Sequence, residues 1–311
     1  MATYQTYTAI GQREDLSDVI YNISPTDTPF MSSIGKGKAS GTYHEWQVDS
    51  LAAVNTSNAA VEGATASDAT LAPTTRAGNR TQISQKTVKV SGTLEAVDKA
   101  GRKSEKAYQL AKASAEIKRD MEAILLSNQV SAAGNASTAR TLGGLQAWLS
   151  SNASVGTGGV VGADGSTART TGTDRTFTET ILKDVVAQVY TNGGTPKVLM
   201  VRPNHKQTVS AFAGIAAQRY MAPSNTPTTI VGAADVYMSD FGTISVVPNR
   251  FITTTDVAFV IDPDMASVNY LRPFSTNELA KTGDAEVTQI ITEYTLQVSN
   301  EAAHGIIADL S

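Results

Sequence analysis

Cysteine is absent from this chain of 311 residues. Its absence excludes disulfides, thiolate metal sites and cysteine nucleophiles, and it suits a protein made in a reducing cytoplasm. Long apolar runs are missing too, since no stretch approaches the ~18 consecutive apolar residues that a membrane-spanning helix needs. Residues 1–11 carry neither a basic segment nor an apolar run, so we expect no signal peptide and no membrane contact.

Charged side chains are scarce, at 17% of the chain against about 25% in an average soluble protein. Ala, Thr, Ser and Gly take their place. Two interpretations remain open: a surface largely covered by further copies of the same chain, or a monomer rich in small residues. The net charge of −4 argues against a general nucleic-acid-binding protein held by phosphate contacts.

Catalytic and cofactor motifs are missing as well. No GxSxG nucleophile elbow occurs, and the histidines are far apart, with none in an HExxH context. The GKGK sequence at 35–38 lacks phosphate-loop spacing and is expected to be a solvated turn. Asp262-Pro263-Asp264 is expected to be a turn after a strand in preference to a cation site. We therefore predict no catalytic residue, no cofactor and no metal site.

The first 40 residues predict an arm without a core of its own. Leu16, Val19 and Ile20 lie at helical spacing and predict a short helix at residues 14–22. Pro25 and Pro29 then force extended or turn conformations. Large apolar residues follow at 30, 31 and 34. They need cover from the rest of the chain.

Two strands predict a long hairpin at residues 41–91. In the first, residues 41–51, Trp46 and Val48 share one face; the second covers residues 80–91. Nearly thirty residues between them, 52–79, are almost all small or polar. Such a segment cannot offset ~1–2 kcal/mol of backbone entropy per residue by its own burial, so ordering it requires a neighbouring molecule. A surface loop without contacts is the alternative.

Residues 104–128 predict the clearest helix of the chain. Lys112 with Glu116 and Lys118 with Glu122 are i,i+4 pairs, which we place on the wetter side. The apolar face repeats at three-and-four spacing and consists of Ala107, Leu110, Ala111, Ile117, Met121, Ile124 and Leu125. A helix of this length fits a spine along the body of the protein.

An α/β pattern follows the glycine-rich stretch at 129–176. A helix is predicted at 179–191, ended by Asn192-Gly193-Gly194, then a strand at 197–201, a helix at 204–217 and a loop at 218–229. Strands dominate after residue 234. They are predicted at 236–239, 243–247, 257–261 and 267–271, with one very long strand at 286–298 whose even-numbered face is the more apolar.

This order of elements resembles the HK97-like fold of tailed-phage major capsid proteins. Three local sequences strengthen the resemblance: ISPTDTPF at 23–30, KRDME at 118–122 and EYTLQVSNEAAHG at 293–305. The resemblance implies an α+β chain divided as in that family. Its parts are an N-terminal arm (1–40), an extended β-hairpin loop (41–91), a peripheral domain with the spine helix (92–130), an axial α/β domain (131–240), and peripheral-domain strands with the C-terminus (241–311).

The resemblance also implies a function and partners. The chain is expected to assemble with itself, as pentamers and hexamers, into the icosahedral head that encloses phage DNA, in the virion after assembly in the host cytoplasm. A separate scaffolding protein is implied, because the chain starts at the arm; a portal, a possible decoration protein and weak non-specific contact with packaged DNA are implied too. Lysine–asparagine crosslinking is not expected, because residues 41–79 contain no lysine. Alternatives are an encapsulin-like compartment shell and a tail-tube or surface-layer protein.

Charge is distributed unevenly along the chain. Residues 76–106 are mainly basic, and the chain from 256 onward is mainly acidic. We hypothesise that the basic hairpin base of one subunit lies over the acidic sheet of the next, where complementary fields set the register. Two independently solvated faces are the alternative. The candidate interface residues are Trp46, Val48, Arg76, Arg80, Lys86, Lys89, Arg102, Lys103, Asp262, Asp264, Glu286 and Glu293.

Overall fold

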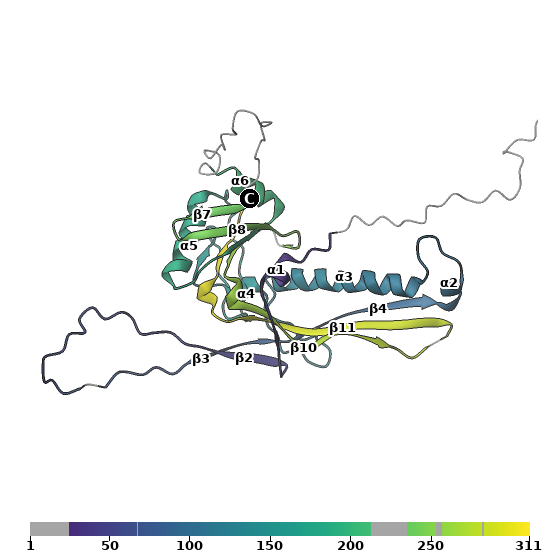
Figure 1. Cartoon of the computed structure of the whole chain (residues 1–311), viewed down its shortest axis with the longest axis horizontal. Helices are drawn as coiled ribbons and strands as arrows, with labels where there is room; N and C mark the ends of the chain where they lie inside the picture. Colours follow the sequence, from purple (N-terminus) through teal and green to yellow (C-terminus); the bar gives the residue numbers. More distant parts are fainter. Residues whose placement is uncertain (1–24, 67, 213–234, 253–256, 282) are drawn as a thin grey trace, which may run out of the picture.

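The computed structural model describes residues 25–66, 68–212, 235–252, 257–281 and 283–311. Within these ranges the chain is α+β, with a long four-stranded sheet, a six-stranded sheet and a two-stranded hairpin (Figure 1). The molecule is elongated, with the hairpin loop at one end and the far end of the long sheet at the other (Figure 1). None of the described helices is long and apolar enough to cross a lipid bilayer.

The long sheet supports the main helix. Its strands, in spatial order, are β1 (Gly35–Lys38), β10 (Ala266–Glu278), β11 (Ala285–Val298) and β4 (Gln82–Ser91). Helix α3 (Glu105–Leu125) runs along β4 and β11 and begins where the Ser104 hydroxyl accepts a hydrogen bond from Ala107 N at 3.1 Å (Figure 1). At ~1.5 Å per residue, its 21 residues span about 32 Å. The predicted helix and the long strand are both confirmed.

The buried face of α3 differs from the predicted one. Ile117, Met121 and Leu125 are buried as expected, but Ala107 and Ala111 are exposed. The face is centred on the i,i+4 series that starts at Ala113, and the two exposed alanines lie on its flank.

The six-stranded sheet forms the second layer. In spatial order its strands are β5 (Ala153–Ser154), β12 (Gly305–Ile307), β9 (Ala258–Ile261), β6 (Val198–Val201), β8 (Gly242–Pro248) and β7 (Val236–Ser239). Helix α5 (Glu179–Thr191) covers one face and ends as predicted, with Gly193 at φ 88°. Helix α6 (Pro203–Ser210) is shorter than expected; residues 213–217 of the predicted helix, and the loop predicted at 218–229, lie outside the described residues.

The expected division of the chain at residue 240 is not followed by the sheets. Strands β8, β9 and β12 pair with the sheet of β6 and β7, and only β10 and β11 join the long sheet. The reason is long-range pairing: β6 pairs with β8 in parallel and with β9 in antiparallel orientation, which no local pattern specifies.

The hairpin also pairs differently from the prediction. Strand β2 (Tyr43–Val48) pairs with β3 (Thr75–Arg80), whereas the strand predicted at 80–91 is β4, which pairs with β11 in the long sheet. The chain turns from β3 into β4 at Thr81, which separates the two strands. The glycine–lysine segment at 35–38 is likewise not a turn but the edge strand β1, parallel to β10.

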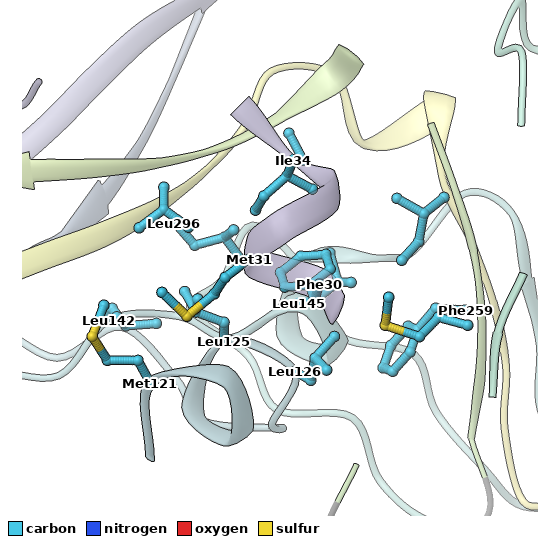
Figure 2. Close-up of a cluster of buried hydrophobic side chains, with 14 of the residues drawn as sticks. Phe30, Met31, Ile34, Met121, Leu125, Leu126, Leu142, Leu145, Phe259 and Leu296 are labelled. Atoms are coloured by element: carbon cyan, nitrogen blue, oxygen red, sulfur yellow. The ribbon is translucent and has the colours of Figure 1, made fainter. Parts of the chain in front are cut away.

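The arm contributes to the main core. Helix α1 (Pro29–Ser33) and Ile34 bury Phe30, Met31 and Ile34 (Figure 2). They pack in one apolar cluster with side chains of α3, of α4 (Leu145–Trp148) and of the sheets (Figure 2). The helix predicted at 14–22 lies outside the described residues.

Candidate assembly surfaces

The root of the hairpin is held by its own subunit. Asn79 of β3 is fully buried, and its Nδ2 donates to the carbonyl oxygens of Gly143 at 3.0 Å and Leu296 at 2.8 Å. Its Oδ1 accepts from Gly143 N at 2.8 Å and from Arg80 N at 2.9 Å. One side chain thereby joins β3, β11 and the loop before α4.

Glu293 of β11 forms a second anchor beside this root. Its carboxylate accepts hydrogen bonds from Thr81 Oγ1 and Arg272 Nε, both at 2.8 Å, and pairs with Arg140. The side chain is only 5% exposed in the subunit, so these partners already occupy its carboxylate. Its place at an interface stays a prediction. A buried carboxylate needs such partners to offset its desolvation.

Aromatic and amide groups join β2 to the body. The Trp46 ring packs on Trp148 of α4, with centroids 5.4 Å apart, and belongs to the edge of the main core. His44 Nε2 lies 3.0 Å from Gln297 Oε1 and 2.8 Å from Asn269 Nδ2. Trp46 thus packs against its own chain. Gln297 belongs to the odd-numbered face of β11, so the hairpin base lies on the sheet face opposite to α3.

Beyond this root the hairpin projects freely. Every described residue from 49 to 76 is exposed, and the loop extends away from the body (Figure 1). Its large apolar side chains have almost no cover: exposure is 99% at Leu51, 92% at Val54, 81% at Val61 and 89% at Leu71. A cluster of exposed apolar groups on a projecting segment marks an interaction surface.

Most of the predicted interface charges are paired within the subunit. The internal pairs are Arg76 with Glu45, Lys86 with Glu116 and Asp120, Arg102 with Glu105, Glu286 with Lys106 and Lys281, and Asp262 and Asp264 with Lys197. The Arg80 guanidinium lies 5.0 Å from the centre of the Tyr43 ring. Lys89 and Lys103 are exposed and form no ion pair within the described residues, and Val48 is half-buried. The uneven distribution of charge along the sequence did not predict these pairs. Most of them join an acid and a base that are distant in sequence and that the fold brings together.

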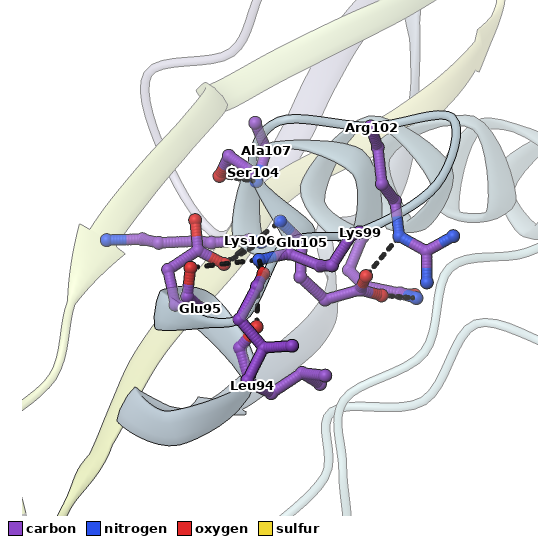
Figure 3. Close-up of polar contacts among 10 residues, drawn as sticks. Leu94, Glu95, Lys99, Arg102, Ser104, Glu105, Lys106 and Ala107 are labelled. Atoms are coloured by element: carbon purple, nitrogen blue, oxygen red, sulfur yellow. Dashed lines mark hydrogen bonds and ion pairs between the residues drawn. The ribbon is translucent and has the colours of Figure 1, made fainter. Parts of the chain in front are cut away.

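The far end of the long sheet carries a polar network between α2 (Gly92–Ala96) and α3 (Figure 3). The Glu95 carboxylate accepts from Glu105 N at 2.9 Å and from Lys106 N at 3.3 Å, and so caps α3 (Figure 3). Hydrogen bonds from the Ser104 hydroxyl and these N–H groups lower the pKa of Glu95. Lys99 Nζ donates to three carbonyl oxygens at the end of α2, those of Leu94, Glu95 and Val97 (Figure 3).

A buried carboxylate that the sequence pattern misplaced holds the arm. Glu122 of α3 is fully buried, not on the wetter side. It accepts hydrogen bonds from Phe30 N at 2.7 Å, Met31 N at 2.9 Å and Asn249 Nδ2 at 2.7 Å. Burial raises the pKa of Glu122, and no cation pairs with it within the described residues. The first turn of α1 is thereby fastened to the spine.

The histidines serve the fold. His304 is fully buried, lies 3.3 Å from the carbonyl oxygen of Met265, and accepts from Asp262 N at 3.3 Å; burial lowers the pKa of His304. Asp262 also accepts from Asp264 N at 3.3 Å and caps the turn Pro263–Met265, as predicted. Within the described residues no group of acids and histidines could hold a metal ion.

Comparison with known proteins decides the family. The model of the SU10 major capsid protein family matches residues 2–311. The chain belongs to this family. The major capsid protein of Escherichia phage Phieco32 is 30% identical to this chain over 341 residues, covering 98% of this chain and 96% of the relative.

Solved structures agree at the level of the fold. A chain of the cyanophage A-1(L) capsid asymmetric unit matches with a TM-score of 0.68 at 11% identity, covering 96% of this chain and 97% of that chain. The SrpI encapsulin of Synechococcus elongatus matches with a TM-score of 0.56 at 10% identity, covering 100% of this chain and 97% of that chain. The present chain therefore has the HK97-like fold. Because an encapsulin shares that fold, the family match decides the function.

This major capsid protein is a structural subunit of the phage head and not an enzyme. Its location is the capsid of the virion. The predicted fold class, family and general function are thus confirmed, and the encapsulin and tail-tube alternatives are set aside.

Proposed function

We propose that the subunit builds its shell by laying the hairpin loop, residues 49–74, across an adjacent copy. The observation that carries this proposal is the contrast along the hairpin. Its root is fastened by Asn79 and Trp46, while four large apolar side chains of the loop are more than four-fifths exposed. Burying each such side chain against a neighbour would contribute about 1.5–3 kcal/mol before ordering costs.

The charge of the loop indicates what receives it. Residues 49–74 contain Asp49, Glu62 and Asp68 and no basic residue. A receiving surface that combines apolar groups with free lysines would suit this loop. The sheet face opposite to α3 offers Ile83, 46% exposed, and the unpaired Lys89. We therefore revise the hypothesis of a basic hairpin base: the acidic loop meets a basic, partly apolar face.

The finer organisation is part of the proposal. The long sheet with α3 corresponds to the peripheral domain, and the six-stranded sheet with α5 to the axial domain, around which copies form pentamers and hexamers. Glycine-rich segments of the axial domain would allow one sequence to fit both rings. A separate scaffolding protein, a portal and a decoration protein are the proposed partners.

Substitution within the loop tests the loop contact. Leu51→Ser with Leu71→Ser should abolish or strongly reduce particle formation, measured by sedimentation and negative-stain microscopy. The circular dichroism of the subunit should stay unchanged, because both side chains lack contacts within it. Ala59→Ser with Ala60→Ser is the matched control in the same loop and should assemble normally. Normal yields of particles from the leucine variant would overturn the proposal.

A further inference from the structure

Free positive charge gathers on one side of the long sheet. Lys36 and Lys38 of β1 and Lys112 and Lys118 of α3 are all exposed and form no ion pair within the described residues. We call these four lysines the lysine face. The strand lysines belong to the α3 side because Lys36 is paired in register with the buried Val268, whose side chain lies in the core beneath α3.

Acids neutralise this face only in part, because Lys112 acts on Glu116 but the four lysines outnumber the two nearest carboxylates on α3. Glu116 and Asp120, the nearest carboxylates on α3, are 2.9 and 3.3 Å from Lys86 Nζ and already share its charge. Hydrogen bonds to these two acids raise the pKa of Lys86 although burial opposes the rise. The lysine face therefore keeps a net positive field in a chain whose net charge is −4.

Symmetry separates the lysine face from the hairpin loop. The hairpin base lies on the opposite side of the sheet, where His44 contacts Gln297 and Asn269. Rotations about axes normal to a shell keep one side of every subunit outward. If neighbouring copies meet through the loop, as proposed above, the loop therefore reaches its neighbour on the hairpin side and leaves the lysine face uncovered.

We infer that the lysine face lines the inside of the head and contacts the packaged DNA. DNA needs only positive charges near its phosphates, and each neutralised phosphate releases a counterion. A protein partner needs apolar or aromatic anchors. Along α3, all of which is described, no large apolar side chain is exposed, and its exposed apolar residues, Ala107 and Ala111, are small. The composition of the face thus fits a polyanion better than a scaffolding protein.

Single-cysteine labelling tests the placement, because the native chain has no cysteine. Lys36→Cys, Lys112→Cys and Lys118→Cys are compared with Gln47→Cys, on the exposed face of β2 at the hairpin base, which lies on the opposite side of the sheet and outside the contact loop. In intact heads, a maleimide on a long polyethylene glycol chain should label Gln47→Cys and spare the other three, all of which should react in dissociated subunits. Labelling of the lysine face from outside overturns the inference.

A small maleimide that passes through the shell identifies the ligand. It should label the lysine-face cysteines in emptied heads and label them several-fold more slowly in DNA-filled heads. Equal rates in filled and empty heads, with protection only in scaffold-containing precursors, would assign the face to a protein and overturn the inference. No labelling in any intact particle would mean that this face is buried between subunits and would overturn it too.

Charge removal gives a second measurement. Replacing all four lysines by Gln should lower the salt dependence of DNA binding by emptied, opened shells, with the slope of log K against log salt falling by about 0.9 for each phosphate that is no longer neutralised. The matched Lys→Arg variant should retain the slope. An unchanged slope in the Gln variant overturns the inference. Particle counts and shape should stay normal in both variants, which separates this result from a failure of the hairpin loop to join neighbouring subunits.

Discussion

Glu122→Gln should loosen the arm from the spine. Glu122 accepts three hydrogen bonds of 2.7–2.9 Å with no exposure to solvent. Gln keeps the shape but offers one acceptor oxygen, and its amide hydrogens face N–H donors. At least one buried donor is then left without an acceptor, which costs about 1–3 kcal/mol.

The assay is hydrogen exchange at Phe30 and Met31, whose amides donate to this carboxylate. A loss of about 1–3 kcal/mol corresponds to exchange that is about 5- to 150-fold faster. The control is Glu116→Gln on the same helix, where a partly exposed side chain pairs with Lys86. That change should cost only about 0.2–1 kcal/mol and leave both amides protected. Unchanged exchange at both amides in Glu122→Gln would refute the reasoning.

The pH dependence of the stability that Glu122 contributes has a definite sign. Burial raises the pKa of Glu122 above its ordinary value of 4.5, so the native state binds a proton at a higher pH than the unfolded chain does. This contribution to stability is complete at pH values below the pKa of Glu122 in the unfolded chain. It is lost as the pH rises through the pKa of Glu122 in the folded state. The free energy of unfolding of the wild type should therefore rise relative to that of Glu122→Gln as the pH falls toward 4.5. Urea titration of the unassembled subunit measures both values.

Three further changes test the rest of the subunit. Asn79→Ala should cost about 1–3 kcal/mol in urea unfolding and increase proteolysis at the hairpin root, because the buried carbonyl of Leu296 loses its donor. Asp309→Asn should cost about 3–5 kcal/mol, since Arg169, only 4% exposed, is left as a buried charge without its partner 2.6 Å away; a melting temperature equal to the wild type would contradict it. Gly193→Ala should cost about 1 kcal/mol in the same urea assay, because the residue has φ 88°.

Local patterns predicted the elements whose burial is regular. Helix α5 begins and ends at the predicted residues because its apolar side chains repeat at helical spacing and glycines follow it. The even-numbered face of β11 is buried as predicted, since period-two alternation reports directly which face is covered. The order of such elements carried the resemblance to capsid proteins.

What could not be predicted depends on contacts distant in sequence. The alternation of side chains along β4 suits pairing with either β2 or β11, so no local pattern predicted which of the two strands is its partner. Glu122 was misplaced because its environment is made by residues about ninety positions earlier and more than a hundred later. The paired charges of the candidate interface were missed for the same reason: Glu286, for example, pairs with Lys106, which is 180 positions earlier in the chain.

The position of β12 has a consequence for the timing of folding. This strand lies between β5 and β9, inside the six-stranded sheet, although its residues 305–307 come very late in the chain. A nascent subunit on the ribosome thus lacks the strand that joins β5 to β9 until these residues emerge. The six-stranded sheet can therefore close only after synthesis has passed residues 305–307.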